Sequence, residues 1–204
     1  MKRIITVSRE FGSGGHAVAQ IMGELLGVPV YDKEIIERSA EESGLSPEFI
    51  SRNEQNLSSE WLYSVGLGSR YASPSLLTFA DTVFLAQRKA IVGFARNGSC
   101  IIVGRCADHI LTHCEEISAS DVLNIFVFAP AAFKADWAVR ERGFSPKTAE
   151  RDIRIIDKKR ANHYSTFTEQ TWGARENYNL FVDSSILGIE GTAQSLVEFV
   201  RKTK

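Results

Sequence analysis

The chain has 204 residues, which is enough for one domain with a sizeable core and a small inserted subdomain. Its 24 lysines and arginines nearly balance its 25 aspartates and glutamates, so bulk charge attracts neither nucleic acid nor an anionic membrane. Charges near the N-terminus interrupt the apolar core of a signal peptide, and no apolar run approaches the roughly 20 residues of a membrane span. We therefore expect a cytoplasmic protein without nucleic-acid or membrane partners, its oligomeric state left open.

The first half of the chain predicts short apolar strands that alternate with amphipathic helices. Ile4–Val7 is a β-branched run suited to a buried strand, and the helix after it stops at Gly27. Ser46 and Pro47 have the residue types of a helix N-cap and first turn. The predicted elements are a strand at 4–7, a helix at 17–26, a strand at 28–32, a helix at 33–43 and a helix beginning at 46.

The second half continues the alternation after an irregular segment. The segment from Asn53 to Ser75 is rich in serine and contains Gly66, Gly68 and Pro74, which predicts a loop or a mobile subdomain element. The elements predicted beyond it are strands at 100–104, 122–130 and 178–185, and helices at 76–97, 133–143, 148–165 and 191–202. This order indicates an α/β fold in which helices cover both faces of a parallel sheet.

A glycine-rich loop joins the first predicted strand to the first helix. It contains Gly12, Ser13, Gly14, Gly15 and His16. Glycines allow backbone N–H groups to converge, and the start of a helix adds partial positive charge, so this arrangement predicts a phosphate site. The alternative is a tight strand-to-helix turn without a ligand, but three glycines in four residues exceed what such a turn needs.

Charged residues near the loop and in the helix at 148–165 offer further phosphate contacts. Arg9 can bind phosphate through a guanidinium fork, although an ordinary surface ion pair with Glu10 is an equal alternative. Arg154, Asp157 and Arg160 recur at intervals of three, which favours phosphate contact for the two arginines over a merely solvated helix. Neighbouring Lys158 and Lys159 are expected to stay solvated.

Arg105 follows a buried strand and a glycine. This places it at the carboxyl end of the sheet, where open α/β folds bind ligands. Its alternative role is a structural ion pair with Asp108.

The cysteines and histidines do not predict a metal centre. Cys106, His109 and His113 can share a helix face, but their spacing matches no recognised zinc motif. The three cysteines include no Cys-x-x-Cys pair, so we expect reduced, partly buried thiols.

Six segments in the same order resemble the cytidylate kinases, P-loop enzymes that transfer phosphate from ATP to CMP, and most closely their cytidylate kinase-like branch. The segments are IITVSREFGSGGHAVAQIMGELLG, YDKEIIERSA, FLAQRKAI, IIVGRCADHIL, ERDIRIIDKKRANHY and YNLFVDSSILGIEGTAQSLVEFV. The resemblance covers nearly the whole chain and is weakest between Asn53 and Ser75. It implies a three-layer P-loop NTPase fold in one domain, residues 1–204, with a nucleoside-monophosphate-binding region at about 32–90 and a lid at about 147–172.

The resemblance also implies roles for individual residues. Asp32, Arg38, Arg88 and Arg105 would bind the acceptor, and arginines of the lid would close over the transferring phosphate. Trp172 and Gly173 would end the lid helix and form a hinge.

The chain departs from the family at three positions. Gly15 stands at the P-loop lysine, His16 at the magnesium-binding Ser/Thr, and Val103 where relatives often carry Asp or Glu. Lysine supplies charge to the β- and γ-phosphates and the hydroxyl holds the metal, so another group must replace them in an active kinase. Arg9 is the candidate for the lysine, and His16 can donate a hydrogen bond at the helix start.

The resemblance implies an ATP-dependent nucleoside monophosphate kinase with CMP or dCMP as acceptor, and Mg²⁺ carried by the nucleotide. Arg9, Arg154 and Arg160 would be catalytic, and the loop from Gly12 to His16 would hold the nucleotide phosphates. Two alternatives remain: a nucleotide-binding module without turnover, and a kinase of a different small acceptor.

Overall fold

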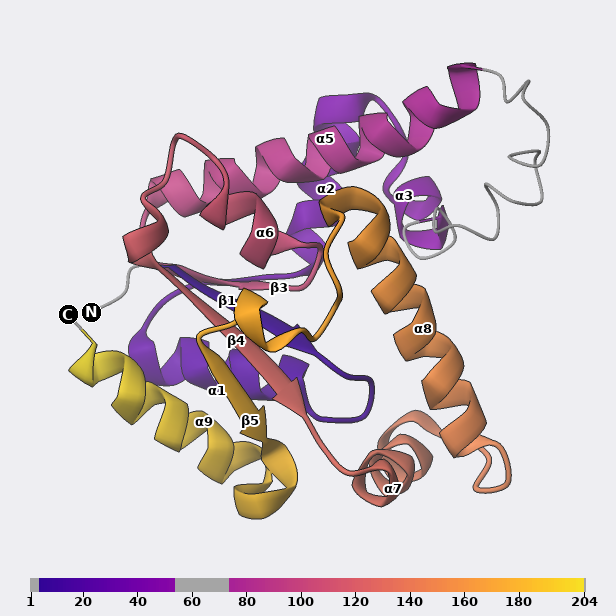
Figure 1. Ribbon diagram of the computed structural model, residues 1–204, viewed down its shortest axis with the longest axis vertical. Helices are drawn as coiled ribbons and strands as arrows, with labels where there is room; N and C mark the ends of the chain where they lie inside the picture. The colour runs from indigo at the N-terminus through magenta and orange to yellow at the C-terminus, as the bar shows by residue number, and fades with distance from the viewer. Residues whose placement is uncertain (1–3, 54–73, 204) are drawn as a thin grey trace.

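A parallel five-stranded sheet forms the centre of the protein (Figure 1). The structure is a computed structural model that describes residues 4–53 and 74–203. The strand order is β2-β3-β1-β4-β5, and every pairing is parallel. The strands are β1 (Ile4–Arg9), β2 (Val30–Tyr31), β3 (Cys100–Val103), β4 (Val122–Phe128) and β5 (Leu180–Asp183).

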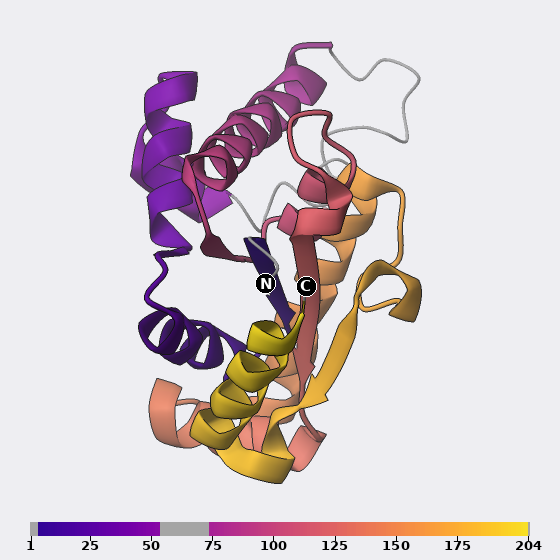
Figure 2. The same ribbon diagram turned by 90° about the vertical axis from the view of Figure 1, so that its left-hand side faces the viewer.

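Helices cover both faces of this sheet (Figures 1 and 2). The described helices are α1 (Gly15–Leu26), α2 (Lys33–Ser43), α3 (Pro47–Asn53), α5 (Pro74–Asn97), α6 (Ala107–Thr112), α7 (Ala131–Arg142), α8 (Ala149–Thr168) and α9 (Ser184–Lys202). Short 3₁₀ turns lie at Ala119–Asp121 and Arg175–Asn177.

The alternation of side chains along each strand divides the core into two layers. Ile4 and Ile102 belong to one layer, which packs against α5 and α6. Ile5, Val7 and Ile101 belong to the other, which packs against α1 and α9. Because the central strands are buried on both faces, they read as continuous apolar runs in the sequence.

The predicted fold class is confirmed, and the element boundaries shift by a few residues. The first helix begins at Gly15 rather than Ala17, and the last begins at Ser184 rather than Gly191, with a non-helical residue at Gly188. The short helix α6 was not assigned as an element from the sequence. Most of the irregular segment predicted from Asn53 to Ser75 lies outside the described residues, whereas Pro74 and Ser75 begin α5.

The three cysteines have the buried, reduced thiols that the sequence indicates. Cys100, Cys106 and Cys114 are buried and form no disulfide. In the described part of the chain, no helix is both long and apolar enough to cross a bilayer.

Candidate active site

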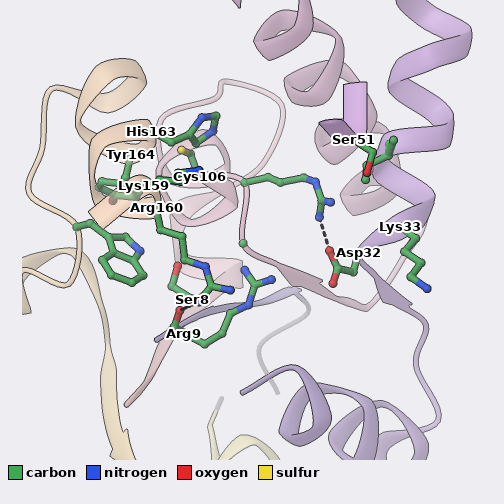
Figure 3. A pocket seen from close by; sticks show the side chains of 14 residues that line it. Ser8, Arg9, Asp32, Lys33, Ser51, Cys106, Lys159, Arg160, His163 and Tyr164 are labelled. Carbon is green, nitrogen blue, oxygen red and sulfur yellow. Dashed lines mark hydrogen bonds and ion pairs between the residues drawn. The ribbon is translucent and has the colours of Figure 1, made fainter. Parts of the chain in front are cut away.

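A cavity of about 340 Å³ lies at the carboxyl ends of β1, β2 and β3, with α8 as its opposite wall (Figure 3). Parallel strands bring residues far apart in the sequence to this edge, the usual binding position in open α/β folds. The lining residues are Ser8, Arg9, Asp32, Lys33, Ile36, Ser51, Gly104, Arg105, Cys106, Lys159, Arg160, His163, Tyr164 and Trp172.

The charged side chains of the cavity are mostly cationic. Those of the described residues are the cations of Arg9, Lys33, Arg105, Lys159 and Arg160 and the single carboxylate of Asp32. A concave site with this excess of positive charge attracts an anionic ligand, and guanidinium groups suit phosphate or carboxylate oxygens in particular.

Asp32 joins the cavity to the start of α1. One carboxylate oxygen accepts a hydrogen bond from Arg105, and the other lies 3.0 Å from Nδ1 of His16. Burial alone would raise the pKa of Asp32, but the hydrogen bond from His16 and the charges of Arg105 and Arg9 hold it well below its usual range. The carboxylate therefore stays ionised, and Arg105 pairs with Asp32 rather than with Asp108.

The glycine-rich loop has the backbone of an anion site. Gly14 is the N-cap of α1 in the left-handed conformation, with φ 73°, and no described side chain caps this end of the helix. Gly12 is also left-handed, with φ 83°, and a β-carbon there would lie 2.7 Å from the carbonyl oxygen of Lys134. The glycines thus allow both the sharp turn and the close approach of α7, while the first amides of α1 face the loop.

Arg9 runs beneath this loop into the cavity. A β-carbon at position 15 would lie 2.5 Å from Cβ of Arg9, and one at Gly104 would overlap its Nη1. The arginine side chain therefore fills the space between Gly15 and Gly104. Figure 3 shows the Arg9 and Arg160 side chains directed into the same part of the cavity. Glu10 pairs with Lys134 at 2.8 Å, so its carboxylate is directed to α7.

Helices α7 and α8 lie against the tip of the loop. The N–H of Phe11 donates a hydrogen bond of 2.7 Å to Asp157, and Arg160 donates one of 3.0 Å to the carbonyl oxygen of Arg9. The Phe11 ring stacks on Phe144 with centroids 5.3 Å apart, and the Arg160 guanidinium lies 5.6 Å from the Phe11 centroid. These contacts hold α8, which belongs to the predicted lid, against the loop.

A buried polar network supports the cavity from below. Tyr164 lines the cavity and donates a hydrogen bond of 2.7 Å to Asp108, which is 2% exposed. Burial, and next the charge of Asp108, raise the pKa of the Tyr164 and Tyr178 hydroxyls. Both hydroxyls therefore stay protonated at neutral pH.

Three of the arginines proposed from the sequence lie away from the cavity. Arg38 pairs with Glu41 and Glu42, and Arg88 lies 3.9 Å from Glu116. Both arginines line a separate surface hollow of about 820 Å³ between α2 and α5. The structure thus groups Asp32 and Arg105 at the cavity and leaves these two arginines elsewhere.

Arg154 is the third, with a side chain that is 71% exposed and paired with Glu150. Successive residues of an α-helix advance by about 100°, so Arg154 and Arg160 lie roughly 120° apart around α8. The three-residue spacing therefore does not make one stripe. Lys158 is exposed as expected, whereas Lys159 reaches the cavity and corrects the expectation that it is solvated.

Several cavity residues were not singled out from the sequence. His163 and Tyr164 follow Arg160 at i+3 and i+4, so helical geometry was a signal for both. Trp172, which the sequence indicated only as part of the lid hinge, lines the cavity and packs edge-on against Phe126. Ser8 carried no local signal, because only the sheet places it beside α8.

Among the described residues, the cavity offers few ligands for a metal ion, so a metal would bind there together with a nucleotide. In residues 4–53 and 74–203, no three His, Cys, Asp or Glu side chains are placed to hold a metal ion, and the His109 and His113 rings stack on each other. Val103 points into the core layer under α1 and offers no carboxylate. Among the described residues, Asp32 is thus the one carboxylate lining the cavity, and Mg²⁺ commonly combines one or two carboxylates with substrate phosphates and waters.

Comparison with known proteins agrees with this architecture. Residues 4–186 match the model of the cytidylate kinase-like family. The chain belongs to the cytidylate kinase-like family. Among curated proteins, none matches this chain.

Solved structures show the same fold at low sequence identity. An uncharacterized protein from Eubacterium ventriosum is 21% identical with a TM-score of 0.69, and 98% of each chain is covered. The shikimate kinase of Acinetobacter baumannii is 13% identical with a TM-score of 0.54, covering 98% of this chain and 95% of its own. The shikimate kinase of Bacteroides thetaiotaomicron is 14% identical with a TM-score of 0.52, covering 97% and 98%. These similarities extend the P-loop kinase fold to the whole chain.

Proposed function

We propose that the protein is an ATP-dependent kinase of a small anionic acceptor, with CMP or dCMP as the preferred acceptor. The observation that carries this proposal is the cationic cavity at the strand ends, directly beside a glycine-rich loop that leads into a helix. Phosphoryl transfer requires alignment of two substrates and neutralisation of charge, and these two adjoining sites provide both.

Each part of the site has a role in this proposal. The loop from Gly12 to His16 holds the nucleotide phosphates through backbone N–H groups. Arg105 holds the acceptor phosphate, and Asp32 orients Arg105 and His16. Bound with the nucleotide, Mg²⁺ would neutralise charge on the phosphate oxygens, beside Asp32.

Arg9 and Arg160 are the proposed catalytic cations. Both line the cavity, and Arg160 is also hydrogen-bonded to the backbone of Arg9 at the entry to the loop. In this proposal they act between the two substrate sites and stabilise the transferring phosphoryl group. Arg154 contributes to transfer only if α8 rotates or shifts, because its side chain is exposed here.

The acceptor assignment is supported by the family and by the charge of the cavity. Membership of the cytidylate kinase-like family favours a nucleoside monophosphate. Arg105 and Lys159 suit its phosphate, and Trp172 and His163 offer flat surfaces to a base.

Two alternatives keep specific support. Gly15, His16 and Val103 lack the chemical groups of a standard P-loop kinase, which favours a nucleotide-binding module without turnover. The fold shared with shikimate kinases, together with the cationic cavity, favours a kinase of another small anionic acceptor.

An acceptor panel separates these functions. Purified protein is incubated with ATP and Mg²⁺ and with CMP, dCMP, UMP, AMP or shikimate, and ADP formation is measured. Acceptor-dependent turnover that is highest with CMP or dCMP supports the proposal. Turnover with another acceptor supports the second alternative. Calorimetric binding of ATP without turnover on any acceptor supports the binding module.

A further inference from the structure

A carboxylate of the protein itself, that of Asp157, is bound to the backbone at the start of the glycine-rich loop. Asp157 of α8 accepts the Phe11 N–H at 2.7 Å through Oδ1, and Nη1 of Arg160 lies 3.3 Å from the same oxygen. Nζ of Lys134 lies 3.7 Å from the other carboxylate oxygen. A loop amide and two cations from two helices thus converge on one carboxylate.

The members of this cluster are shielded from solvent. The side chains of Lys134, Asp157 and Arg160 are 13%, 15% and 19% exposed. Glu10 fixes the Lys134 ammonium from the other side at 2.8 Å. The position of the ammonium is therefore set by two carboxylates, and it is not that of a freely rotating surface lysine.

The carboxylate is not fully stabilised where it sits. Burial raises the pKa of Asp157, and the Phe11 N–H, Arg160 and Lys134 oppose this only in part, while Glu10 adds to it. A ligand with more negative charge and more acceptor oxygens gains more from the same three donors.

The cluster adjoins the loop amides. Phe11 directly precedes Gly12, and the backbone of Lys134 packs against Gly12. Arg160 also connects the cluster to the cavity, because it lines the cavity and donates a hydrogen bond to the carbonyl oxygen of Arg9. An anion held by Lys134 and Arg160 would therefore lie next to the phosphates held by Gly12–His16.

We propose that the Phe11 N–H, Lys134 and Arg160 form the site of the terminal phosphate of the nucleoside triphosphate, and that Asp157 fills this site until the nucleotide displaces it. This inference rests on the proposed function and names residues for it. In this arrangement, Lys134 of α7 supplies the ammonium charge that Gly15 lacks, and α8 exchanges its Asp157 contact with the loop for an Arg160 contact with the bound phosphate. Nucleotide binding and lid movement are thereby coupled.

Calorimetric titration with ATP and with ADP, both with Mg²⁺, tests the assignment because only ATP carries the terminal phosphate. Asp157→Asn keeps an acceptor for the Phe11 N–H but removes the competing charge, so we expect about tenfold tighter ATP binding and unchanged ADP binding. Lys134→Ala is expected to weaken ATP binding by about tenfold or more and ADP binding far less. Lys134→Arg keeps the charge and should retain most of the preference for ATP.

Matched controls are Asp136→Asn on α7 and Lys158→Ala on α8, whose side chains are exposed. Circular dichroism verifies that each variant folds. If Lys134→Ala does not fold, the comparison of ATP with ADP is made with Lys134→Arg. Equal effects of Asp157→Asn on ATP and ADP, in a protein that turns over, would overturn the inference and leave the proposed function standing. Binding of ATP by Asp157→Asn but not by the unaltered protein would support it. Failure of both to bind ATP would overturn the inference and the proposed function together.

Discussion

A β-carbon at position 15 would lie 2.5 Å from Cβ of Arg9, so the two positions cannot both carry side chains in this arrangement. The glycine at the P-loop lysine position is thus matched to an arginine on the preceding strand. An added Cβ at Gly15 would also lie 3.2 Å from Cβ of Val127, which closes the second side of the same space. The absence of a lysine at position 15 therefore changes the chemistry of the loop, and it also follows from the packing of Arg9 and Val127 around this position.

Arg9→Ala tests whether Arg9 acts in catalysis. In a protein shown to turn over, we expect the substitution to lower turnover by about a hundredfold or more, because a charge-stabilising contact to the transferring group is removed. Steady-state kinetics measures the change, and circular dichroism monitors the fold. Arg140→Ala is the control, because Arg140 is exposed and pairs only locally with Asp136. Unchanged turnover in Arg9→Ala would exclude the catalytic role.

Gly15→Lys tests the packing explanation. Arg9→Ala retains Cβ, so we expect Gly15→Lys to lower the melting temperature in both the unaltered and the Arg9→Ala background. Arg9→Gly removes that atom, and the Arg9→Gly/Gly15→Lys pair should melt at a higher temperature than Arg9→Ala/Gly15→Lys. Thermal unfolding of the unaltered protein and these four variants decides the point. Equal melting temperatures of the two double variants would contradict it.

The fold and the glycine-rich loop could be predicted from the sequence, because both depend on local patterns. Apolar runs marked the buried strands, and Gly12–His16 marked the strand-to-helix turn. The cavity depends on which segments the topology brings together, and this is not local. Lys134 illustrates the limit: it belongs to an ordinary charged helix and gains its role only because α7 packs on Gly12.

The direction of side chains on helices was the second feature that the sequence could not predict. Arg38, Arg88 and Arg105 all occur in segments that resemble the family, but only Arg105 lines the cavity. The residue after a strand leaves the sheet at a known edge, so its position can be predicted. A residue on a helix can point either toward the ligand or away from it, depending on the face of the helix that it occupies. The location of a helix residue carried over from the family therefore depends on its side-chain direction, which the resemblance does not give.

Arginine substitutions test this division of the acceptor site. Arg105→Ala removes a guanidinium from the cavity and leaves Asp32 without that partner, so we expect the acceptor KM to rise by about tenfold or more. Arg88→Ala alters an exposed residue in the separate hollow, and we expect little change in KM. Initial rates at saturating ATP with varied acceptor give both values. A larger effect from Arg88→Ala would place the acceptor elsewhere, or require α2 and α5 to move.

Hydrogen exchange tests the mobility of the lid and its contact with the loop. We expect amides at 147–172 to exchange faster than those of Cys100–Val103, because a lid must open reversibly for product to leave. Phe11→Ala removes the ring that packs on Trp137, Phe144 and Arg160, and should speed exchange in α8 further. Phe199→Ala on α9 is the control, since Phe199 is 42% exposed. Exchange in α8 as slow as in β3 would argue against a mobile lid.

The buried network beneath the cavity predicts how stability depends on pH. Burial raises the pKa of Asp108 above its ordinary 3.8, outweighing the hydrogen bond from Tyr164, so the folded state binds this proton more tightly than the unfolded chain does. The contribution of Asp108 to stability is therefore full below that ordinary value and is lost as the pH rises through the raised folded-state pKa.

Asp108→Asn tests this dependence, because it cannot ionise and retains an oxygen that accepts the hydrogen bond of the Tyr164 hydroxyl. We expect the melting temperature of the unaltered protein, relative to that of Asp108→Asn, to fall as the pH increases from below 3.8 and then to level off. A constant difference between the unaltered protein and Asp108→Asn would show that Asp108 ionises equally well in the folded and unfolded states.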